Sequence, residues 1–305
     1  MALSTRAIRR RIKSVKNTRK ITKAMELVSA SKMRKAVSSV LMSRPFARLA
    51  WETVSSIGAV VDVSLHPLLR KNNQTGKILL VLLTSDRGLA GGFNANMIKK
   101  IIQLTKEYGS ENLEAIAIGR KGADAVRRSG VKLIASFSDI TNNPKFEEIL
   151  PIGKMAVDEF IKENYDKVLL AYTDFVSAIR QEPVVLELLP FGTAADFYRV
   201  GNVSTQASPA SKAFPAFQAP KEYTFEPSPT EVLNRLLPRL VETTVYQAVL
   251  ESAASEHSAR MLAMRNASDS AAEMIDSLTF TYNQFRQAAI TREIAEISAG
   301  KAALE

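Results

Sequence analysis

The chain has 305 residues, no cysteine, and two histidines, His66 and His257, that lie far apart in the sequence. Disulfide bonds, thiol catalysis and cysteine-ligated metal sites are therefore excluded, and no histidine-based metal site is predicted. The formal net charge is +10, and a chain of this length can form one large domain or two.

The positive charge is concentrated at the N-terminal end. Residues 1–48 carry 14 lysines and arginines against a single acid, Glu26, whereas residues 228–305 carry 7 basic and 10 acidic residues. We therefore expect a partner with an acidic surface for the N-terminal segment only. The sequence has no run of about 18 apolar residues, so no membrane-spanning segment is predicted.

The N-terminal segment reads as one long helix. Residues 1–44 contain neither glycine nor proline. A stripe recurs every three or four positions: Ile8, Ile12, Val15, Thr18, Ile21, Met25 and Val28. This spacing predicts one packed face of a helix that extends to about residue 63. An arginine-rich start is also typical of a mitochondrial transit peptide, but the stripe continues into the rest of the helix, so we interpret it as mature structure.

The same basic helix could instead read DNA, as the basic region of a leucine zipper does. In such proteins the basic residues precede the zipper. Here Arg9, Arg10 and Arg11 are interleaved with the apolar stripe. We therefore expect no nucleic-acid binding; a DNA-binding protein would show steeply salt-dependent affinity for duplex DNA through these arginines.

The middle of the chain alternates short apolar runs with helical patterns. The runs cover residues 77–86, 113–119, 131–137, 166–175 and 184–190, and the helical patterns lie near 94–108, 121–129 and 147–163. The first four runs are typical of buried parallel strands. Residues 76–200 are therefore predicted to form a Rossmann-like, doubly wound α/β domain. Residues 201–227, rich in Ser, Ala and Pro, are predicted to form a surface loop.

Residues 228–305 predict a second long helix. Ser228 as N-cap, Pro229 at the first helical position and Glu231 three residues after the cap form a capping box. No glycine or proline occurs from residue 239 to 299. Roughly 70 helical residues would extend about 105 Å. Near the end, an apolar seam of coiled-coil spacing comprises Ile275, Leu278, Tyr282, Phe285 and Ala289.

The two long helices join the same α/β domain at its two ends. We therefore expect segments 1–63 and 228–305 to pack as one discontinuous, antiparallel coiled coil, with the α/β domain inserted between them. Because the C-terminal helix is longer, its last turns should project beyond the pair. This tip, residues 288–304, is small and apolar, and is better suited to an apolar collar than to water.

The loop at residues 86–94, DRGLAGGFN, lies between a strand and a helix, where phosphate-binding loops occur. It lacks both the Gly-Lys-Ser/Thr ending of a P-loop and the G-x-G-x-x-G spacing. A tight strand-to-helix turn is therefore the favoured interpretation. The alternative function, a nucleotide-binding α/β enzyme with helical arms, would depend on Gly91 and Gly92 in this loop. We find no catalytic constellation and predict no cofactor.

Four segments together resemble the gamma subunit of the rotary F-type ATP synthase. They are ITKAMELVSASKMRKA (21–36), TSDRGLAGGFN (84–94), SEHSARMLAM (255–264) and YNQFRQAAITREIAEISAGKAAL (282–304). They occur in the order found in that family and span essentially the whole chain. The first and last are long, and they lie where the periodicity independently predicts the two long helices.

The resemblance implies a mechanical function. The gamma subunit is the central shaft inside a ring of three alpha and three beta subunits, and it couples rotation of the membrane ring of c subunits to conformational changes at the catalytic beta subunits. The α/β domain, with the epsilon subunit, is expected on the c ring. The chain would then be non-catalytic and peripheral, on the cytoplasmic face of a bacterial membrane or, alternatively, on the matrix side of the mitochondrial inner membrane.

The resemblance also implies contacts with the beta subunit. Arg286 and Gln287 match hydrogen-bonding contacts to a loop of beta, and Thr291 lies in the same motif. Met25 matches a methionine near the acidic lever loop of beta, and Arg87 in the DRGL turn is expected to face that region.

Cysteine usage departs from two family patterns. Ala90 stands where the family often has cysteine after DRGL. The chloroplast members' regulatory cysteine pair is also missing, so thiol control is not expected.

Overall fold

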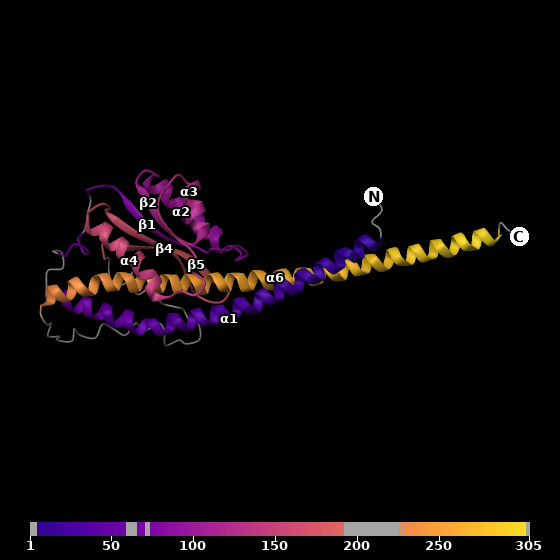
Figure 1. Ribbon diagram of the computed structural model, residues 1–305, viewed down its shortest axis with the longest axis horizontal. Helices are drawn as coiled ribbons and strands as arrows, with labels where there is room; N and C mark the ends of the chain where they lie inside the picture. The colour runs from indigo at the N-terminus through magenta and orange to yellow at the C-terminus, as the bar shows by residue number, and fades with distance from the viewer. Residues whose placement is uncertain (1–4, 59–65, 71–73, 192–225, 227, 303–305) are drawn as a thin grey trace. The chain divides into compact units, whose positions relative to one another are not determined.

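A computed structural model describes residues 5–58, 66–70, 74–191, 226 and 228–302. The chain forms two compact units: unit 1 combines residues 1–29 with 261–305, and unit 2 comprises residues 30–260. Two long helices, α1 (Thr5–Gly58) and α6 (Pro229–Ala302), each contribute to both units (Figure 1). Each unit is described by itself below.

Both long helices are present as predicted, but the described residues do not include every predicted end. The expected extension of the first helix to residue 63, and the loop at 201–227 apart from Glu226, lie outside the described residues. Pro45 lies within α1 and does not end it. The Ser228 hydroxyl accepts a hydrogen bond from the backbone N–H of Glu231 at 3.2 Å, which is the predicted cap of α6. The division into segments 1–63, 76–200, 201–227 and 228–305 stays a prediction.

Unit 2 contains a five-stranded sheet in the order β3-β2-β1-β4-β5. Its strands are β1 (Ile78–Leu83), β2 (Leu113–Ile118), β3 (Lys132–Phe137), β4 (Lys167–Phe175) and β5 (Gln181–Leu189). The first four are parallel, and β5 is antiparallel to β4. The connecting helices are α2 (Phe93–Tyr108), α3 (Arg120–Arg128) and α4 (Phe146–Ile161). The predicted α/β class with long terminal helices is confirmed.

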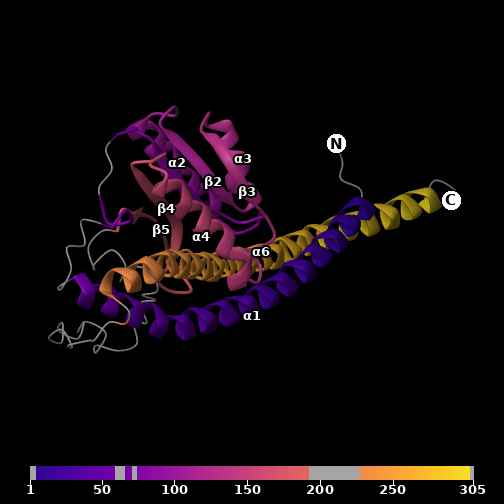
Figure 2. The ribbon, with the colours of Figure 1, turned by 60° about the vertical axis from the view of Figure 1, so that its left-hand side comes forward.

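Helices cover both faces of this sheet, as a doubly wound fold requires (Figures 1 and 2). Met97 and Ile101 of α2 and Val126 of α3 pack on one face. On the other face, Ile152 of α4 and Leu237 of α6 belong to a larger core. The first part of α6 is therefore an integral layer of the α/β domain.

Two strands differ from the sequence prediction. β3 was predicted to be buried, but it is an edge strand whose residues alternate between exposed and half-buried, with an irregular register against β2 at Ala115 and Ile116. β5 begins at Gln181, before the apolar run at 184–190. Its first residues, including Pro183, are polar or lack an N–H, which an edge strand tolerates.

In unit 1, the start of α1 runs antiparallel to the last part of α6 (Figures 1 and 2). The seam differs from the predicted stripe. Ile21 and Val28 are 60% and 54% exposed, whereas Thr22 and Ser29 are buried. The Thr22 hydroxyl lies 2.6 Å from that of Ser268 on α6, in a buried hydrogen bond. Small polar residues therefore occupy seam positions, which an apolar pattern does not reveal.

The two helices also pack together within unit 2. Ala36 and Val40 of α1 are buried against Leu250, Ala253 and Ala254 of α6. Alanines at the contact allow the helix backbones to approach closely. This stretch of α6 is thus enclosed by α1 and the sheet.

Candidate functional surfaces

The predicted beta-subunit contacts on α6 lie in unit 1. Arg286, Gln287 and Thr291 are all exposed, and within the described residues their side chains make no hydrogen bond or ion pair. Gln287 and Thr291 are four residues apart and therefore share one helix face. Met25 on α1, also in unit 1, is half-buried. All four positions are compatible with contact to another chain.

The end of α6 presents apolar side chains to solvent. Every residue from 283 to 299 is exposed. Among them, Ile290, Ile294 and Ile297 are 48%, 59% and 68% exposed. Soluble surfaces seldom keep such a row of large apolar side chains, so this face is suited to burial against another molecule.

Arg87, the remaining predicted contact, lies in unit 2 on the turn between β1 and α2. Its side chain is exposed, and within the described part of the chain it has no ion-pair partner. Ala90, in the same turn, is buried.

The turn after β1 is held closed by its own side chains. The Ser85 N–H donates to Asn94 Oδ1 at 3.1 Å, and the Ser85 hydroxyl donates to the Arg87 carbonyl at 2.6 Å. The Asp86 carboxylate accepts from the backbone N–H groups of Arg120 and Asp139 at 3.1 and 2.9 Å. These bonds tie together three loops at the carboxyl edge of the sheet, and they support the tight-turn interpretation of the glycine-rich segment.

Helix α6 reaches the same turn through Arg260. Its Nη2 donates to the carbonyls of Arg87 and Gly88 at 3.4 and 3.3 Å, and it lies 2.8 Å from Glu256 Oε1. The side chains of Arg260 and Glu256 are only 11% and 6% exposed. A buried, charge-assisted pair therefore joins α6 to the turn that presents Arg87.

Burial determines the electrostatics around the Glu256–Arg260 pair and the neighbouring His257. Burial raises the pKa of Glu256, and the nearby Arg260 only partly offsets this rise. Burial also lowers the pKa of His257 to about 4, helped by the positive charges of Arg260 and Lys32. His257 is thus neutral at physiological pH. Lys32 of α1 donates to Asn142 Oδ1 at 2.7 Å, which links the other long helix to the same edge of the sheet.

The crevice where α/β folds commonly bind ligands is filled by α6. In the order β3-β2-β1-β4-β5 the chain reverses direction across the sheet between β1 and β4, and ligands usually bind outside the carboxyl ends of such strands. Here Ser252 of α6 accepts a hydrogen bond from the Thr173 N–H of β4, while Arg260 binds the turn after β1. This arrangement disfavours the alternative of a nucleotide-binding enzyme.

Sequence reasoning identified SEHSARMLAM as a family segment but assigned no role to Glu256, His257 or Arg260. Arg260 binds the carbonyls of Arg87 and Gly88, which lie about 170 residues earlier in the chain, and no local pattern reveals such pairing. The signal that was present was a charged pair spaced four residues apart in an otherwise small and polar stretch of helix.

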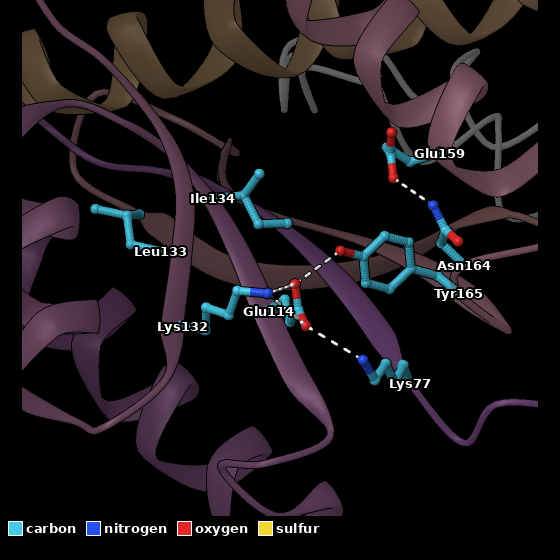
Figure 3. A pocket seen from close by; sticks show the side chains of 8 residues that line it. All are labelled: Lys77, Glu114, Lys132, Leu133, Ile134, Glu159, Asn164 and Tyr165. Atoms are coloured by element: carbon cyan, nitrogen blue, oxygen red, sulfur yellow. Dashed lines mark hydrogen bonds and ion pairs between the residues drawn. The ribbon is translucent and has the colours of Figure 1, made fainter. Parts of the chain in front are cut away.

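A cleft of about 510 Å³ lies at the opposite, amino-terminal edge of the sheet. At its floor, Glu114 of β2 is bound by the Tyr165 hydroxyl at 2.9 Å and by Lys132 at 3.2 Å, with Lys77 at 3.6 Å (Figure 3). Across the cleft, Asn164 donates to Glu159 at 2.7 Å. The charged groups thus already have partners within the chain, so we interpret the cluster as stabilising structure and not as a ligand site.

Replacing Tyr165 with phenylalanine is expected to lower the free energy of unfolding by about 1.5–3 kcal/mol, because buried Glu114 loses a donor. Burial raises the pKa of Glu114, but the hydrogen bonds from Tyr165 and Lys132 outweigh it and hold the pKa below its ordinary value. Stability from Glu114 is therefore present above its unfolded pKa and lost as pH falls through the folded value.

Urea unfolding of the purified chain near neutral pH and in acid would check this expectation. The difference between parent and Tyr165→Phe should shrink in acid. Tyr246→Phe is the control, because this half-buried tyrosine has no hydroxyl hydrogen bond within the described residues and keeps its ring contact with Phe146. Equal stability of the two variants would contradict the role of Tyr165.

The described residues contain neither a metal-binding cluster nor a membrane-spanning helix. No group of three or more His, Asp or Glu side chains there is arranged to hold a metal ion. None of the helices, as far as the structure describes them, is long and apolar enough to cross a membrane.

Comparison with known proteins gives a consistent result. The family model described as ATP synthase matches residues 4–304. The ATP synthase gamma chain of Herpetosiphon aurantiacus is 42% identical over 310 residues, with 99% of each chain covered. That of Moorella thermoacetica is 43% identical over 300 residues, covering 98% of this chain and 99% of the relative.

Solved structures of ATP synthases contain chains that are similar to this one. The central stalk and c-ring structure of Tetrahymena thermophila mitochondrial ATP synthase contains a chain that is 28% identical, with a TM-score of 0.58, covering 81% of this chain and 99% of that one. A chain of the Euglena gracilis mitochondrial ATP synthase has a TM-score of 0.64 at 18% identity, covering 98% and 94%, and shows the same fold.

Proposed function

The chain belongs to the ATP synthase gamma-chain family, and on that premise we propose which of its surfaces make the contacts of a rotor shaft. It is the central rotor shaft of an F-type ATP synthase, and it is a non-catalytic subunit of the membrane-associated F1 sector, where catalysis takes place on the beta subunits.

The proposed partners are three alpha and three beta subunits around this one chain, the epsilon subunit, and the membrane ring of c subunits. The assembly would lie on the cytoplasmic face of a bacterial membrane, and the bacterial source of the similar gamma chains supports this location. The alpha and beta ring is proposed to enclose unit 1. The α/β domain of unit 2 is proposed to meet the c ring together with epsilon.

The single observation that carries the proposed ring contact is the exposed end of α6. Ile290, Ile294 and Ile297 form an apolar row in solvent, and Arg286, Gln287 and Thr291 offer polar groups without partners among the described residues. An apolar collar would bury the isoleucines without fixing one rotational position, because apolar contact has no directional preference. The polar groups would then bind the facing loop of beta at particular angles of rotation.

The basic face of α1 supports a second contact. Arg9, Arg10 and Arg11 are all exposed in unit 1 and have no ion-pair partner among the described residues. If these charges face acidic loops of the ring, the interaction energy would change only gradually with the angle of rotation. Exposed charges in water interact weakly and over several ångströms. Met25, which is half-buried about four turns further along α1, is proposed to touch the lever loop of beta.

Replacing Arg286 and Gln287 together with alanine is expected to lower ATP synthesis by membranes several-fold, because two beta contacts are lost while the fold is kept. Both side chains are exposed, so the stability of the chain should change little. The matched control is Arg265→Ala with Asn266→Ala, an exposed pair earlier in the same helix. ATP synthesis equal to that of the parent, with normal assembly, would contradict the contact assignment.

A further inference from the structure

Helix α6 meets the sheet of unit 2 through a row of buried serine hydroxyls. Ser252, Ser255 and Ser258 follow one another at intervals of three residues on successive turns of the helix, and their exposed fractions are 5%, 0% and 0%. Serine is a mediocre helix former, and it can compete for backbone hydrogen bonds. Three of them, fully enclosed on one side of a helix, therefore call for a specific reason.

Two of the hydroxyls bind the two backbone polar groups of one residue of β4. The Thr173 N–H donates to Ser252 Oγ at 3.0 Å, and Ser255 Oγ donates to the Thr173 carbonyl at 3.2 Å. The pairing of β1 with β4 ends at Leu82 and Ala171, so Thr173 lies beyond the reach of β1. The helix hydroxyls thus replace the missing neighbouring strand.

The pairing of Thr173 on its other side is consistent with this. Thr173 lies opposite Pro183 of β5, which has no N–H to offer. Opposed residues in an antiparallel pair alternate between bonded and non-bonded positions, and at a non-bonded position both backbone groups point away from the partner strand. Both groups of Thr173 are therefore directed to α6.

The third hydroxyl binds the turn that joins β4 to β5. Ser258 Oγ donates to the Ala178 carbonyl at 2.6 Å. The turn is itself rigid, because the Ser177 N–H donates to the Arg180 carbonyl at 2.9 Å and Gln181 Nε2 donates to two of its carbonyls at 3.2 Å. The three serines are thus fixed to backbone atoms that cannot easily move.

We propose that Ser252, Ser255 and Ser258 lock α6 against rotation about its own axis relative to the sheet, so that torque passes between the α/β domain and the shaft helix without slip. The proposal rests on the established shaft function but not on the contacts assigned to the ring. The rest of the contact between α6 and the sheet is apolar and includes Leu237, Val241 and Val245, and apolar contact has no directional preference. Directional hydrogen bonds at three heights along the helix resist a twist that such packing would permit.

The hydroxyls are positioning groups and touch no substrate. Their effect would be carried along α6, which continues as one helix from Pro229 to Ala302. The Glu256–Arg260 pair lies within the same turns and binds the turn after β1. The serines fix the helix to β4 and to the hairpin beyond it, so the two sets of bonds act on separate parts of the sheet edge.

The test uses the assembled enzyme in which all three serines are replaced with alanine. A probe is attached through Lys106→Cys on α2, which would be the only cysteine of this chain. With the catalytic sites locked, the angular variance of the probe is expected to rise about twofold, since only apolar packing and the Arg260 hydrogen bonds then resist the twist. Proton pumping per ATP hydrolysed should fall, whereas unloaded ATP hydrolysis should stay unchanged.

Ser268→Ala is the matched control, because Ser268 is also a buried serine of α6, but it binds Thr22 of α1 and not the sheet. It should leave the variance unchanged. If the triple variant does not assemble, the single variant Ser258→Ala tests the proposal through the same measurement of angular variance. An assembled serine variant with the parent's variance and pumping ratio overturns the proposal, and failure of the Arg286 and Gln287 prediction does not affect this test.

Discussion

Replacing Arg260 with leucine is expected to destabilise unit 2 by about 3–5 kcal/mol, because Glu256 is then left buried without its charged partner. The turn after β1 also loses the two hydrogen bonds to its carbonyls. Because that turn presents Arg87, ATP-driven proton pumping should fall together with stability. Urea unfolding of the purified chain and pumping by membranes would measure the two effects.

The pH dependence provides a signature of the mechanism. Burial already raises the pKa of Glu256, and loss of Arg260 should raise it further. A folded state that holds a proton more tightly than the unfolded state loses stability as pH rises. The cost of Arg260→Leu should therefore be larger at about pH 8 than at about pH 5.

The control is the double variant Glu256→Met with Arg260→Leu. Removing both charges leaves no unpaired ion, so the double variant should be more stable than Arg260→Leu alone. Two results together would contradict the role of the Glu256–Arg260 pair. Arg260→Leu would lower the free energy of unfolding by no more than the double variant does, and the decrease would be the same at both pH values.

Replacing Gly119 with alanine is expected to cost several kcal/mol, on the order of 3 or more. Gly119 has φ +95°, and a Cβ there would lie 2.2 Å from the backbone carbonyl oxygen of Thr84 at the end of β1. Its N–H also donates to the Phe137 carbonyl at 2.8 Å. Relieving the clash requires the end of β1 to move, and with it the turn that presents Arg87.

Gly130→Ala is the matched control, because Gly130 also has positive φ, +77°, but has no atom within 4 Å of a Cβ. It should cost only the backbone strain, about 1–2 kcal/mol. Chemical unfolding of both variants checks the comparison. If the two substitutions cost the same, the close approach to Thr84 is not what requires glycine at position 119.

The regular elements of this chain could be predicted because their signals are local. Apolar runs mark β1, β2 and β4, which are buried on both faces, and the absence of glycine and proline marks the two long helices. β5 was placed too late because its first residues, including Pro183, belong to an edge. Edge positions carry little apolar signal, since half of their surface is not buried by the core.

The contacts that join α6 to α1 and to the sheet could not be predicted, because the residues that form them are distant from one another in the sequence. Thr22 and Ser29 occupy the seam as small polar residues, so the apolar stripe named Ile21 and Val28 instead. In the sequence, Ser252 and Ser255 are ordinary helix residues, and only the fold places Thr173 beside them. The beta-subunit contacts Met25, Arg87, Arg286, Gln287 and Thr291 come from family resemblance alone, and they stay predictions.

The most direct measurement is rotation of this chain within a fixed ring of the proposed alpha and beta subunits. A bead on Lys106→Cys of the α/β domain, the only cysteine that this chain would then have, would report motion when ATP is added. The account predicts steady rotation in one direction with three pauses per turn, one for each catalytic beta subunit. A bead that stays still, or only fluctuates, while the ring hydrolyses ATP would contradict it.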